Sequence, residues 1–195
     1  MKVYHGTSVS SLNGILEQGI DLSKSQKYLD FGSGFYTSTS YDTAECTANN
    51  KCIRLNRFNA SNSSYVEEHP CVIEFDLNSN PNMKKLEFDS PTKAWAMFVA
   101  TNRSMIDSDR VTRHHNFDGK YDIVEGPIAD GKNLTNTMQL VKKGLKIIED
   151  IEPEDFAPSA KYEWGWQISF HSKVSLYCLT STLVVYYLKG GDEHV

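Results

Sequence analysis

Hydrophobic residues recur along the chain at two spacings, which together predict a mixture of helices and strands. Apolar positions three or four residues apart are typical of amphipathic helices, and short runs of β-branched and aromatic residues are typical of strands. The helical spacing predicts helices between 8 and 19, over 41–48 or a little beyond, from 90–91 onward, over 135–148 and over 176–179. The strand pattern covers 3–4, 35–39, 71–76, 85–88, 121–125, 166–170 and 183–188.

The order of these elements favours the α+β class, because strands and helices are mixed without a regular strand–helix–strand rhythm. The chain has 195 residues, of which 39% are hydrophobic and 23% are charged. This composition excludes a disordered, collagen-like or coiled-coil protein. We expect a single domain over 1–188, followed by a flexible tail over 189–195.

The charge and cysteine content of the chain indicate which kinds of partner and which cellular compartment to expect. The formal net charge is -5. The sequence has no obvious cluster of lysine and arginine, so we do not expect a general nucleic-acid-binding surface. No apolar run reaches the roughly 18 residues that a membrane helix needs, so we expect no membrane partner. The chain shows no signal-peptide pattern, and its cysteines lack zinc-ligand spacing, which favours reduced thiols in the cytoplasm. The four cysteines are Cys46, Cys52, Cys71 and Cys178.

Three segments carry residues suited to chemistry. The first, 4–7, reads Tyr-His-Gly-Thr at the end of the first predicted strand, where a histidine can hydrogen-bond and a glycine allows close approach to the backbone. The second, 31–38, places an aromatic residue on a strand that follows a glycine-containing loop. The third, 166–171, reads Trp-Gln-Ile-Ser-Phe-His. Taken singly, each also fits a structural role: a strand-end histidine, a core tyrosine or a surface glutamine.

Taken together, the order and spacing of these segments resemble the ADP-ribosyltransferase superfamily, in its diphtheria-toxin and poly(ADP-ribose) polymerase branch. That branch combines a histidine in a first-strand HG[TS] motif, a tyrosine that leads a later strand, and an acidic residue near the chain end. The chain is most similar to a bacterial and phage group with further motifs, matched here at 21–25, 29–36, 121–124, 126–130 and 167–171. The resemblance spans about 3–180 and implies two small packed sheets that form an NAD cleft flanked by helices.

The resemblance implies a role for each matched residue. His5 would hydrogen-bond the adenosine-side ribose of NAD, and the backbone of Gly6 would bind the nicotinamide amide. Tyr36 would stack on the nicotinamide ring. Thr7 and Ser38 would be polar supports of the same NAD-binding site.

Gln167 would stand where most of the superfamily has a catalytic glutamate. Its carboxamide oxygen can accept a hydrogen bond from a ribose hydroxyl, but a carboxamide carries no charge and cannot act as a general base. Either the acceptor is intrinsically nucleophilic, or a second carboxylate assists. The candidates for that carboxylate are Glu163, Asp30 and Asp130.

Several neighbouring residues refine the expected substrate and site. Gly165 stands where arginine-modifying members have a glutamate or glutamine, which disfavours arginine as the acceptor. Tyr41 is a supporting residue at most, and Arg103 either meets a pyrophosphate or serves the dipole at a helix end. Trp164 and Trp166 would form either an acceptor platform or part of the core.

The resulting hypothesis is an NAD-dependent mono-ADP-ribosyltransferase that needs no metal. His114 and His115 are adjacent, so they do not share a face of a strand, and we interpret them as a solvated loop rather than a metal site. The resemblance implies a bacterial toxin, neutralised by an antitoxin protein, that modifies an unidentified macromolecular or small acceptor. Two alternatives stay open: an NAD glycohydrolase that depletes NAD, and a decayed NAD-binding module.

Overall fold

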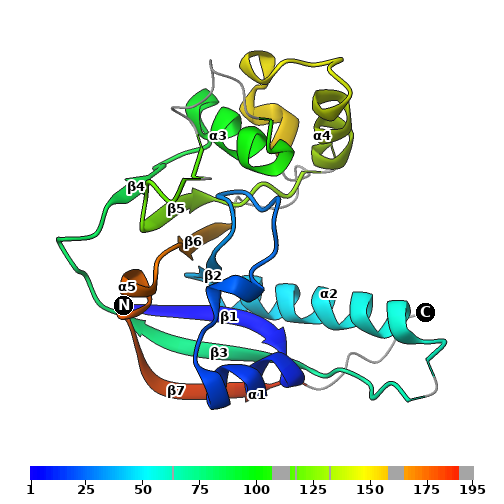
Figure 1. The fold of residues 1–195 in the computed structure, drawn as a ribbon, viewed down its shortest axis with the longest axis vertical. Helices are drawn as coiled ribbons and strands as arrows, with labels where there is room; N and C mark the ends of the chain where they lie inside the picture. Colours follow the sequence, from blue (N-terminus) through cyan, green and yellow to red (C-terminus); the bar gives the residue numbers. More distant parts are fainter. Residues whose placement is uncertain (63, 107–114, 117, 132, 158–164, 189–195) are drawn as a thin grey trace. The chain divides into compact units, whose positions relative to one another are not determined.

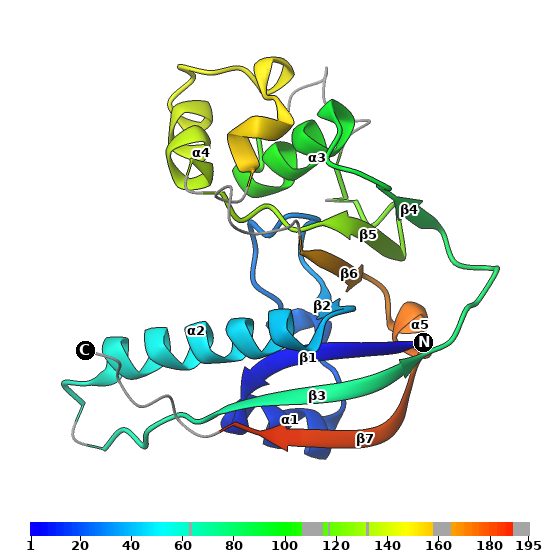
Figure 2. The same cartoon turned by 180° about the vertical axis from the view of Figure 1, so that it is seen from behind.

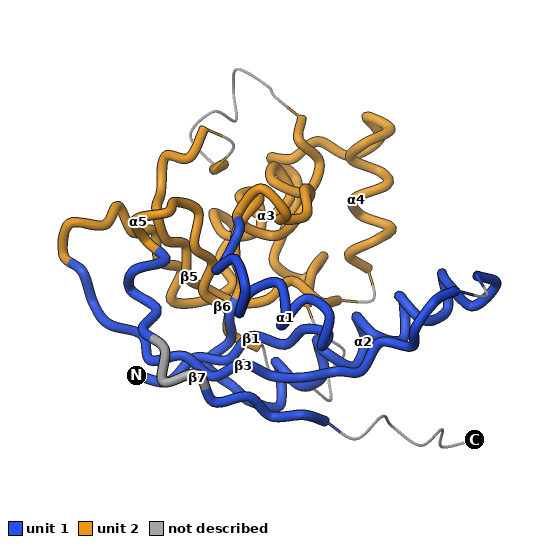
Figure 3. Tube along the Cα trace, turned by 60° about the horizontal axis from the view of Figure 1, so that its bottom comes forward, with its two compact units in different colours: residues 1–21, 37–80, 176–195 blue, residues 22–36, 81–175 orange. Residues whose placement is uncertain are grey.

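The computed structural model describes residues 1–62, 64–106, 115–116, 118–131, 133–157 and 165–188 (Figure 1). The chain divides into two compact units, each assembled from segments that are distant in sequence (Figure 3). Unit 1 contains 1–21, 37–80 and 176–195, and unit 2 contains 22–36 and 81–175. We describe each unit by itself, and the expectation of one domain over 1–188 stays a prediction.

Unit 1 is an antiparallel sheet with two helices. Strand β1 (Lys2–Ser8) pairs with β3 (Pro70–Leu77) along its whole length, and β3 pairs with β7 (Leu179–Tyr187). The three strands run side by side in both Figure 1 and Figure 2. Ser38, the last residue of β2 (Phe35–Ser38), lies opposite Tyr4 on the other edge of β1. The helices are α1 (Val9–Gln18) and α2 (Tyr41–Asn59).

Unit 2 combines a small mixed sheet with a helical cluster. Strand β4 (Lys85–Glu87) is parallel to β5 (Ile123–Pro127), and β5 is antiparallel to β6 (Trp166–Phe170). The α-helices are α3 (Lys93–Ser104), α4 (Leu134–Lys142) and α5 (Lys173–Leu176), the last of which ends at the unit boundary. Short 3-10 turns are η1 (Leu22–Lys24), η2 (Ile148–Asp150) and η3 (Pro153–Phe156).

The core of unit 2 packs α3 against β5 and the turns that follow α4. Its fully buried aromatic residues include Phe31, Trp95 and Phe156, and the Trp95 indole donates to the backbone oxygen of Pro127 at 3.0 Å. Because the last residues of β5 are thereby fixed to α3, the loop that follows β5 has a defined position beside β6. Unit 2 also contains residues 31–36 of the second candidate motif and the whole of the third, 166–171.

The α+β class is confirmed, and the two-sheet NAD cleft stays a prediction. The predicted strands are all present, although β1 and β7 extend further than expected and β5 covers 123–127 rather than 121–125. Several helix bounds were wrong: α2 continues to 59, α3 begins at 93 with Thr92 as its cap rather than at 90–91, and α5 covers 173–176. Helix α4 ends at 142 rather than 148, because Gly144 adopts a left-handed φ of 69° and the chain turns away.

Within the described part of the chain, no helix combines the length and apolar character needed to cross a membrane.

Candidate active site

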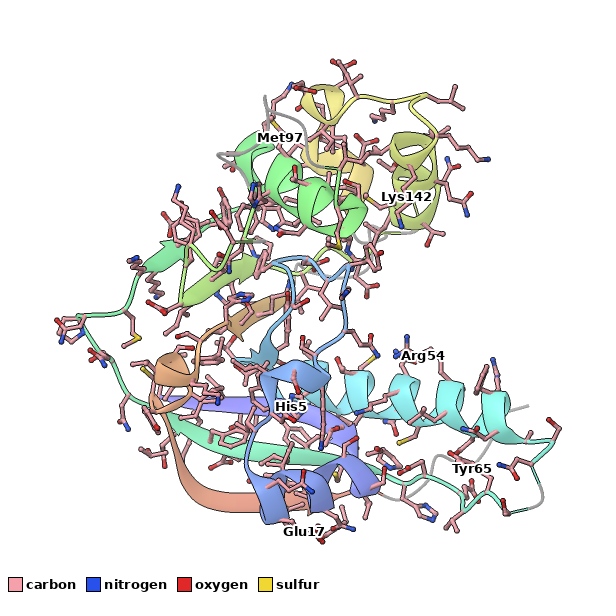
Figure 4. The ribbon with its side chains drawn as sticks, viewed as in Figure 1. His5, Glu17, Arg54, Tyr65, Met97 and Lys142 are labelled. Carbon is pink, nitrogen blue, oxygen red and sulfur yellow. The ribbon has the colours of Figure 1, made fainter. Side chains whose placement is uncertain are left out.

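The first motif lies inside β1 of unit 1, rather than at its end. His5, Gly6 and Thr7 are paired residue by residue with Ile73, Val72 and Cys71 of β3. His5 is half-buried, and Figure 4 labels its position on the strand. Strand β1 therefore holds all three residues with the rigidity of a central strand, which is the support that a binding site needs.

Gly6 is glycine because a helix passes directly over it. A Cβ atom built at this position would lie 1.8 Å from the backbone oxygen of Ala44 and 2.9 Å from the backbone nitrogen of Ala48, both in α2. No side chain fits between β1 and α2 at this contact. The group that approaches the backbone of Gly6 closely is therefore helix α2 of the protein itself. The sequence did not indicate this contact.

Thr7 is buried, and its expected role in an NAD-binding site stays a prediction. Its hydroxyl accepts a hydrogen bond from the Lys51 ammonium at 2.8 Å, and the same ammonium donates to Ser11 at 3.0 Å. Burial lowers the pKa of Lys51 from its usual value. Sequence reasoning missed Lys51 because the predicted second helix stopped before it.

Ser38 and Tyr41 lie at the start of α2. The Ser38 hydroxyl accepts from the Ser40 backbone nitrogen at 3.1 Å, which shapes the turn into the helix. The Tyr41 ring contacts Tyr4 and Tyr186 edge-on, with centroid distances of 5.8 and 5.1 Å. Tyr41 is therefore part of a tyrosine cluster of unit 1, consistent with a supporting role.

In unit 2, Gln167 is buried on β6 and its carboxamide orientation is fixed by acceptors. Its Nε2 donates to Oδ2 of Asp30 at 2.7 Å and lies 3.4 Å from the backbone oxygen of Pro127. Both partners only accept hydrogen bonds, so the nitrogen must face them and Oε1 must face away. Among the described residues no buried side-chain polar atom lacks a partner, and both bonds of Gln167 use Nε2, so Oε1 is reached by solvent.

Asp30 is the carboxylate that the structure brings to Gln167. It is 4% exposed and accepts two further hydrogen bonds, from the backbone nitrogen of Ala129 at 3.0 Å and from Nε of Arg103 at 2.5 Å. Three donors therefore converge on one buried carboxylate, which suits it to orient Gln167 and to supply negative charge. Nε of Arg103 is paired with Asp30, and its position in the last turn of α3 also suits the helix dipole, whereas contact with a pyrophosphate stays a prediction.

The other two expected carboxylates are Asp130 and Glu163. Asp130 is exposed, and Glu163 lies outside the described residues, as do Trp164 and the tail over 189–195. Trp166 is half-buried, and its indole donates to the Glu125 carboxylate at 3.1 Å.

Two backbone hydrogen bonds of its hydroxyl group fix the position of the Tyr36 side chain. The hydroxyl donates to the backbone oxygen of Gly32 at 2.6 Å and accepts from the backbone nitrogen of Phe31 at 3.0 Å. The Phe31 ring stacks near one face of the tyrosine, with centroids 6.4 Å apart. Burial, together with the nearby Asp30 carboxylate, raises the pKa of Tyr36 well above its usual value. The tyrosine is therefore a neutral aromatic group beside the Asp30 cluster.

His171 connects the strand of Gln167 to the loop that precedes Tyr36. Its Nδ1 lies 2.8 Å from the backbone oxygen of Ser33, and its Nε2 lies 2.8 Å from the Ser169 hydroxyl. A Cβ at Gly34 would lie 2.8 Å from the same ring, which explains the glycine. Sequence reasoning gave His171 no role, although period-2 alternation along β6 places Gln167, Ser169 and His171 on one face.

The expected site residues thus form two groups, one in each unit. His5, Gly6, Thr7 and Ser38 gather on neighbouring strands of unit 1, whereas Tyr36 and Gln167 gather with Asp30 in unit 2. No group of three potential metal ligands occurs among the described residues. The prediction that His115 is solvated was wrong, since it is 9% exposed, and His114 lies outside the described residues.

Comparison with known proteins gives a family. A family model described as "Protein of unknown function (DUF3990)" matches residues 1–181, and the chain therefore belongs to this family. No curated protein and no solved structure matches the chain.

Proposed function

We propose that this DUF3990 member is an NAD-dependent mono-ADP-ribosyltransferase. In that reaction the bond between the nicotinamide nitrogen and C1′ of the ribose breaks, and its electrons leave with nicotinamide. A nucleophilic acceptor bonds to C1′ and releases a proton to solvent. One observation supports the proposal most: Asp30 fixes the carboxamide of Gln167 so that its oxygen is the accessible acceptor.

In this proposal Gln167 and Asp30 together perform the two functions of a single catalytic glutamate, which are hydrogen bonding to the ribose and supply of negative charge. The Gln167 oxygen accepts a hydrogen bond from the ribose 2′-hydroxyl and so orients the sugar, although this bond is weaker than one to a carboxylate. The carboxylate of Asp30, 2.7 Å from the Gln167 nitrogen, supplies negative charge near the cationic sugar that develops as the bond breaks. Because three donors already occupy Asp30, it acts through charge and orientation rather than as a proton acceptor.

The remaining roles follow from the matched motifs. His5 binds the adenosine-side ribose, the backbone of Gly6 binds the nicotinamide amide, and the ring of Tyr36 stacks on the nicotinamide ring. Thr7 and Ser38 are polar supports of His5 in this proposal. Thr7 is fixed by Lys51, and Ser38 by the backbone of Ser40. The proposal therefore requires His5 of unit 1 and Gln167 of unit 2 to bind the same dinucleotide.

A toxin that an antitoxin neutralises is the biological setting that we propose. Transfer to an essential acceptor would stop growth, and a partner protein that covers the site would restore it. Gly165, whose backbone oxygen accepts from Ile128 at 2.9 Å, offers no side chain to select an arginine acceptor.

The test is transfer of label from NAD. The purified protein is incubated with NAD labelled in the adenylate phosphate and with cell extract, and the macromolecular fraction is analysed for added ADP-ribose. We expect label on an acceptor with the wild type and none with Gln167→Ala. Gln167→Glu should transfer little, because it replaces the donor to Asp30 with a second carboxylate oxygen and loses the bond that orients the side chain. His5→Ala should weaken NAD binding, measured by calorimetry.

Two controls keep the test sharp. Gln26→Ala changes an exposed glutamine of the same unit and should leave transfer intact. Free ADP-ribose as the sole product would contradict the proposal and identify a glycohydrolase, and saturable NAD binding without turnover would identify a decayed site.

A further inference from the structure

Tyr28 has an unusual backbone and two cavities beside it. It adopts a φ of 65°, and only one other non-glycine residue in the described part of the chain, Met105, has a positive φ. The left-handed region is unfavourable for a side chain as bulky as tyrosine, and such strain concentrates at functional sites. Tyr28 lines a cavity of about 310 Å³ and also a second cavity of about 320 Å³, both within unit 2.

The groups around Tyr28 are cationic. Lys142 at the end of α4, labelled in Figure 4, places its ammonium 4.9 Å from the centroid of the Tyr28 ring. Lys27 lines the first cavity, and Arg103 lines the second beside Lys142. Neither cavity is lined by a carboxylate among the described residues. Arg103 pairs with Asp30, but Asp30 is not one of the lining residues.

The two lysines are available for a ligand. Within the residues that the structure describes, four lysines form ion pairs, namely Lys2, Lys85, Lys93 and Lys146. Lys27 and Lys142 are not among them. The tyrosine side chain itself is 50% exposed, so its ring offers a surface on which a planar group can stack. An exposed aromatic face flanked by unpaired ammonium groups binds a nucleobase by stacking and its phosphate by charge.

The cavities suit a ligand of mononucleotide size. Volumes near 300 Å³ lie at the small end of the range for small-molecule sites. The second cavity also adjoins the proposed reaction site, because Arg103, which lines it, bonds Asp30, and Asp30 bonds Gln167. A ligand in the second cavity would therefore contact Arg103, which is bonded to the Asp30–Gln167 pair.

We infer that Tyr28, with Lys27, Lys142 and Arg103, forms a binding site for a nucleotide, whose base stacks on the ring and whose phosphate meets the cationic groups, and that this nucleotide serves as the ADP-ribose acceptor. The acceptor role rests on the proposed function, whereas nucleotide binding at Tyr28 does not. In the transfer, a nucleophilic nitrogen or oxygen of the nucleotide bonds to C1′, nicotinamide leaves with the electrons of the broken bond, and the proton goes to solvent.

The experiment measures binding of guanosine 5′-monophosphate by calorimetry, without NAD, because this nucleotide is not a part of NAD. We expect saturable binding that is weaker for guanosine or inorganic phosphate alone. Tyr28→Asn should weaken it at least about tenfold, because one stacking contact is lost. Asparagine tolerates a positive φ, so this variant keeps the fold. Tyr28→Phe should retain binding, because the ring stays.

Matched controls separate the site from general effects. Lys142→Gln should weaken binding, whereas Lys143→Gln, an exposed neighbour that lines neither cavity, should not. Tyr177→Asn removes an exposed tyrosine elsewhere and should also have no effect. A 5′-phosphorylated oligonucleotide that binds more tightly than the free nucleotide would identify nucleic acid as the source of the nucleobase.

Two results would overturn the inference. Unchanged nucleotide affinity in Tyr28→Asn would show that the site lies elsewhere. An equal loss of NAD and nucleotide affinity in that variant would assign the cavity to NAD rather than to an acceptor. Absence of transfer activity in the wild type, with Tyr28-dependent nucleotide binding intact, would reject the proposed function and leave the binding site standing.

Discussion

The Asp30 cluster makes a prediction whose size follows from its contacts. In Asp30→Ala three donors lose their acceptor: Gln167, the buried backbone nitrogen of Ala129, and Arg103. In Asp30→Asn the side-chain oxygen can still accept from Gln167 and Ala129, because both bond Oδ2, while the new amide nitrogen faces Arg103. Asparagine therefore removes the charge and the ion pair but keeps the orientation of Gln167.

The magnitudes differ accordingly. A hydrogen bond to a charged group contributes about 1.5–3 kcal/mol, which is the expected loss for Asp30→Asn. Asp30→Ala additionally leaves buried donors unpaired, so we expect about 3–5 kcal/mol. For a chain of this size each kcal/mol lowers the melting temperature by roughly 2–4 °C.

Equilibrium unfolding in denaturant measures both variants, with the exposed Asp130→Asn and Asp130→Ala as controls that should stay within about 0.5 kcal/mol of the wild type. Turnover separates the two roles of Asp30. If charge stabilises the developing sugar cation, Asp30→Asn loses turnover even at temperatures where it is folded. Equal stability of Asp30→Ala and Asp130→Ala would refute the buried cluster.

Three further outcomes follow from the packing and the titratable groups. Gly6→Ala should destabilise unit 1 by about 3 kcal/mol, since its Cβ would meet backbone atoms of Ala44, whereas Gly14→Ala in α1 meets nothing and should be neutral or stabilising in the same melts. Burial lowers the pKa of His171 below its ordinary value of 6.5, so the folded state binds fewer protons than the unfolded state. The stability of the wild type should therefore fall as the pH decreases below about 6.5, and His171→Gln should flatten that dependence while His69→Gln does not. Burial raises the pKa of Cys71 to about 11, so a thiol reagent should modify the exposed Cys46 quickly and the three buried thiols only on unfolding.

Local chemistry explains which elements the sequence predicted well. Strand β6 was predicted at its observed bounds, because alternation over 166–170 is a short-range signal. The extension of α2 was missed since Asn49 and Asn50 interrupt its apolar face. The residues that carry the helix onward are Ala44, Ala48 and Cys52, which are buried at a spacing of four. That spacing was a usable signal.

The residues of the candidate site were likewise predicted where the signal is local and missed where it depends on distant contacts. The sequence singled out Gln167 and Tyr36, and it named Asp30 as one of three possible carboxylates. The choice among the three depends on a contact between residues 137 positions apart, which no local pattern encodes. Similarly, the lack of space for a side chain at position 6 comes from a helix that begins some 35 residues later, so the sequence pointed only to a ligand as the reason for the glycine.

The most direct test of the central proposal is the rate of nicotinamide release from saturating NAD in the presence of cell extract. We expect release by the wild type and a rate at least about 100-fold lower for Gln167→Ala, with NAD affinity nearly unchanged, because the variant loses the hydrogen bond that orients the ribose as the bond to nicotinamide breaks. Equal rates of release from the two proteins would contradict it.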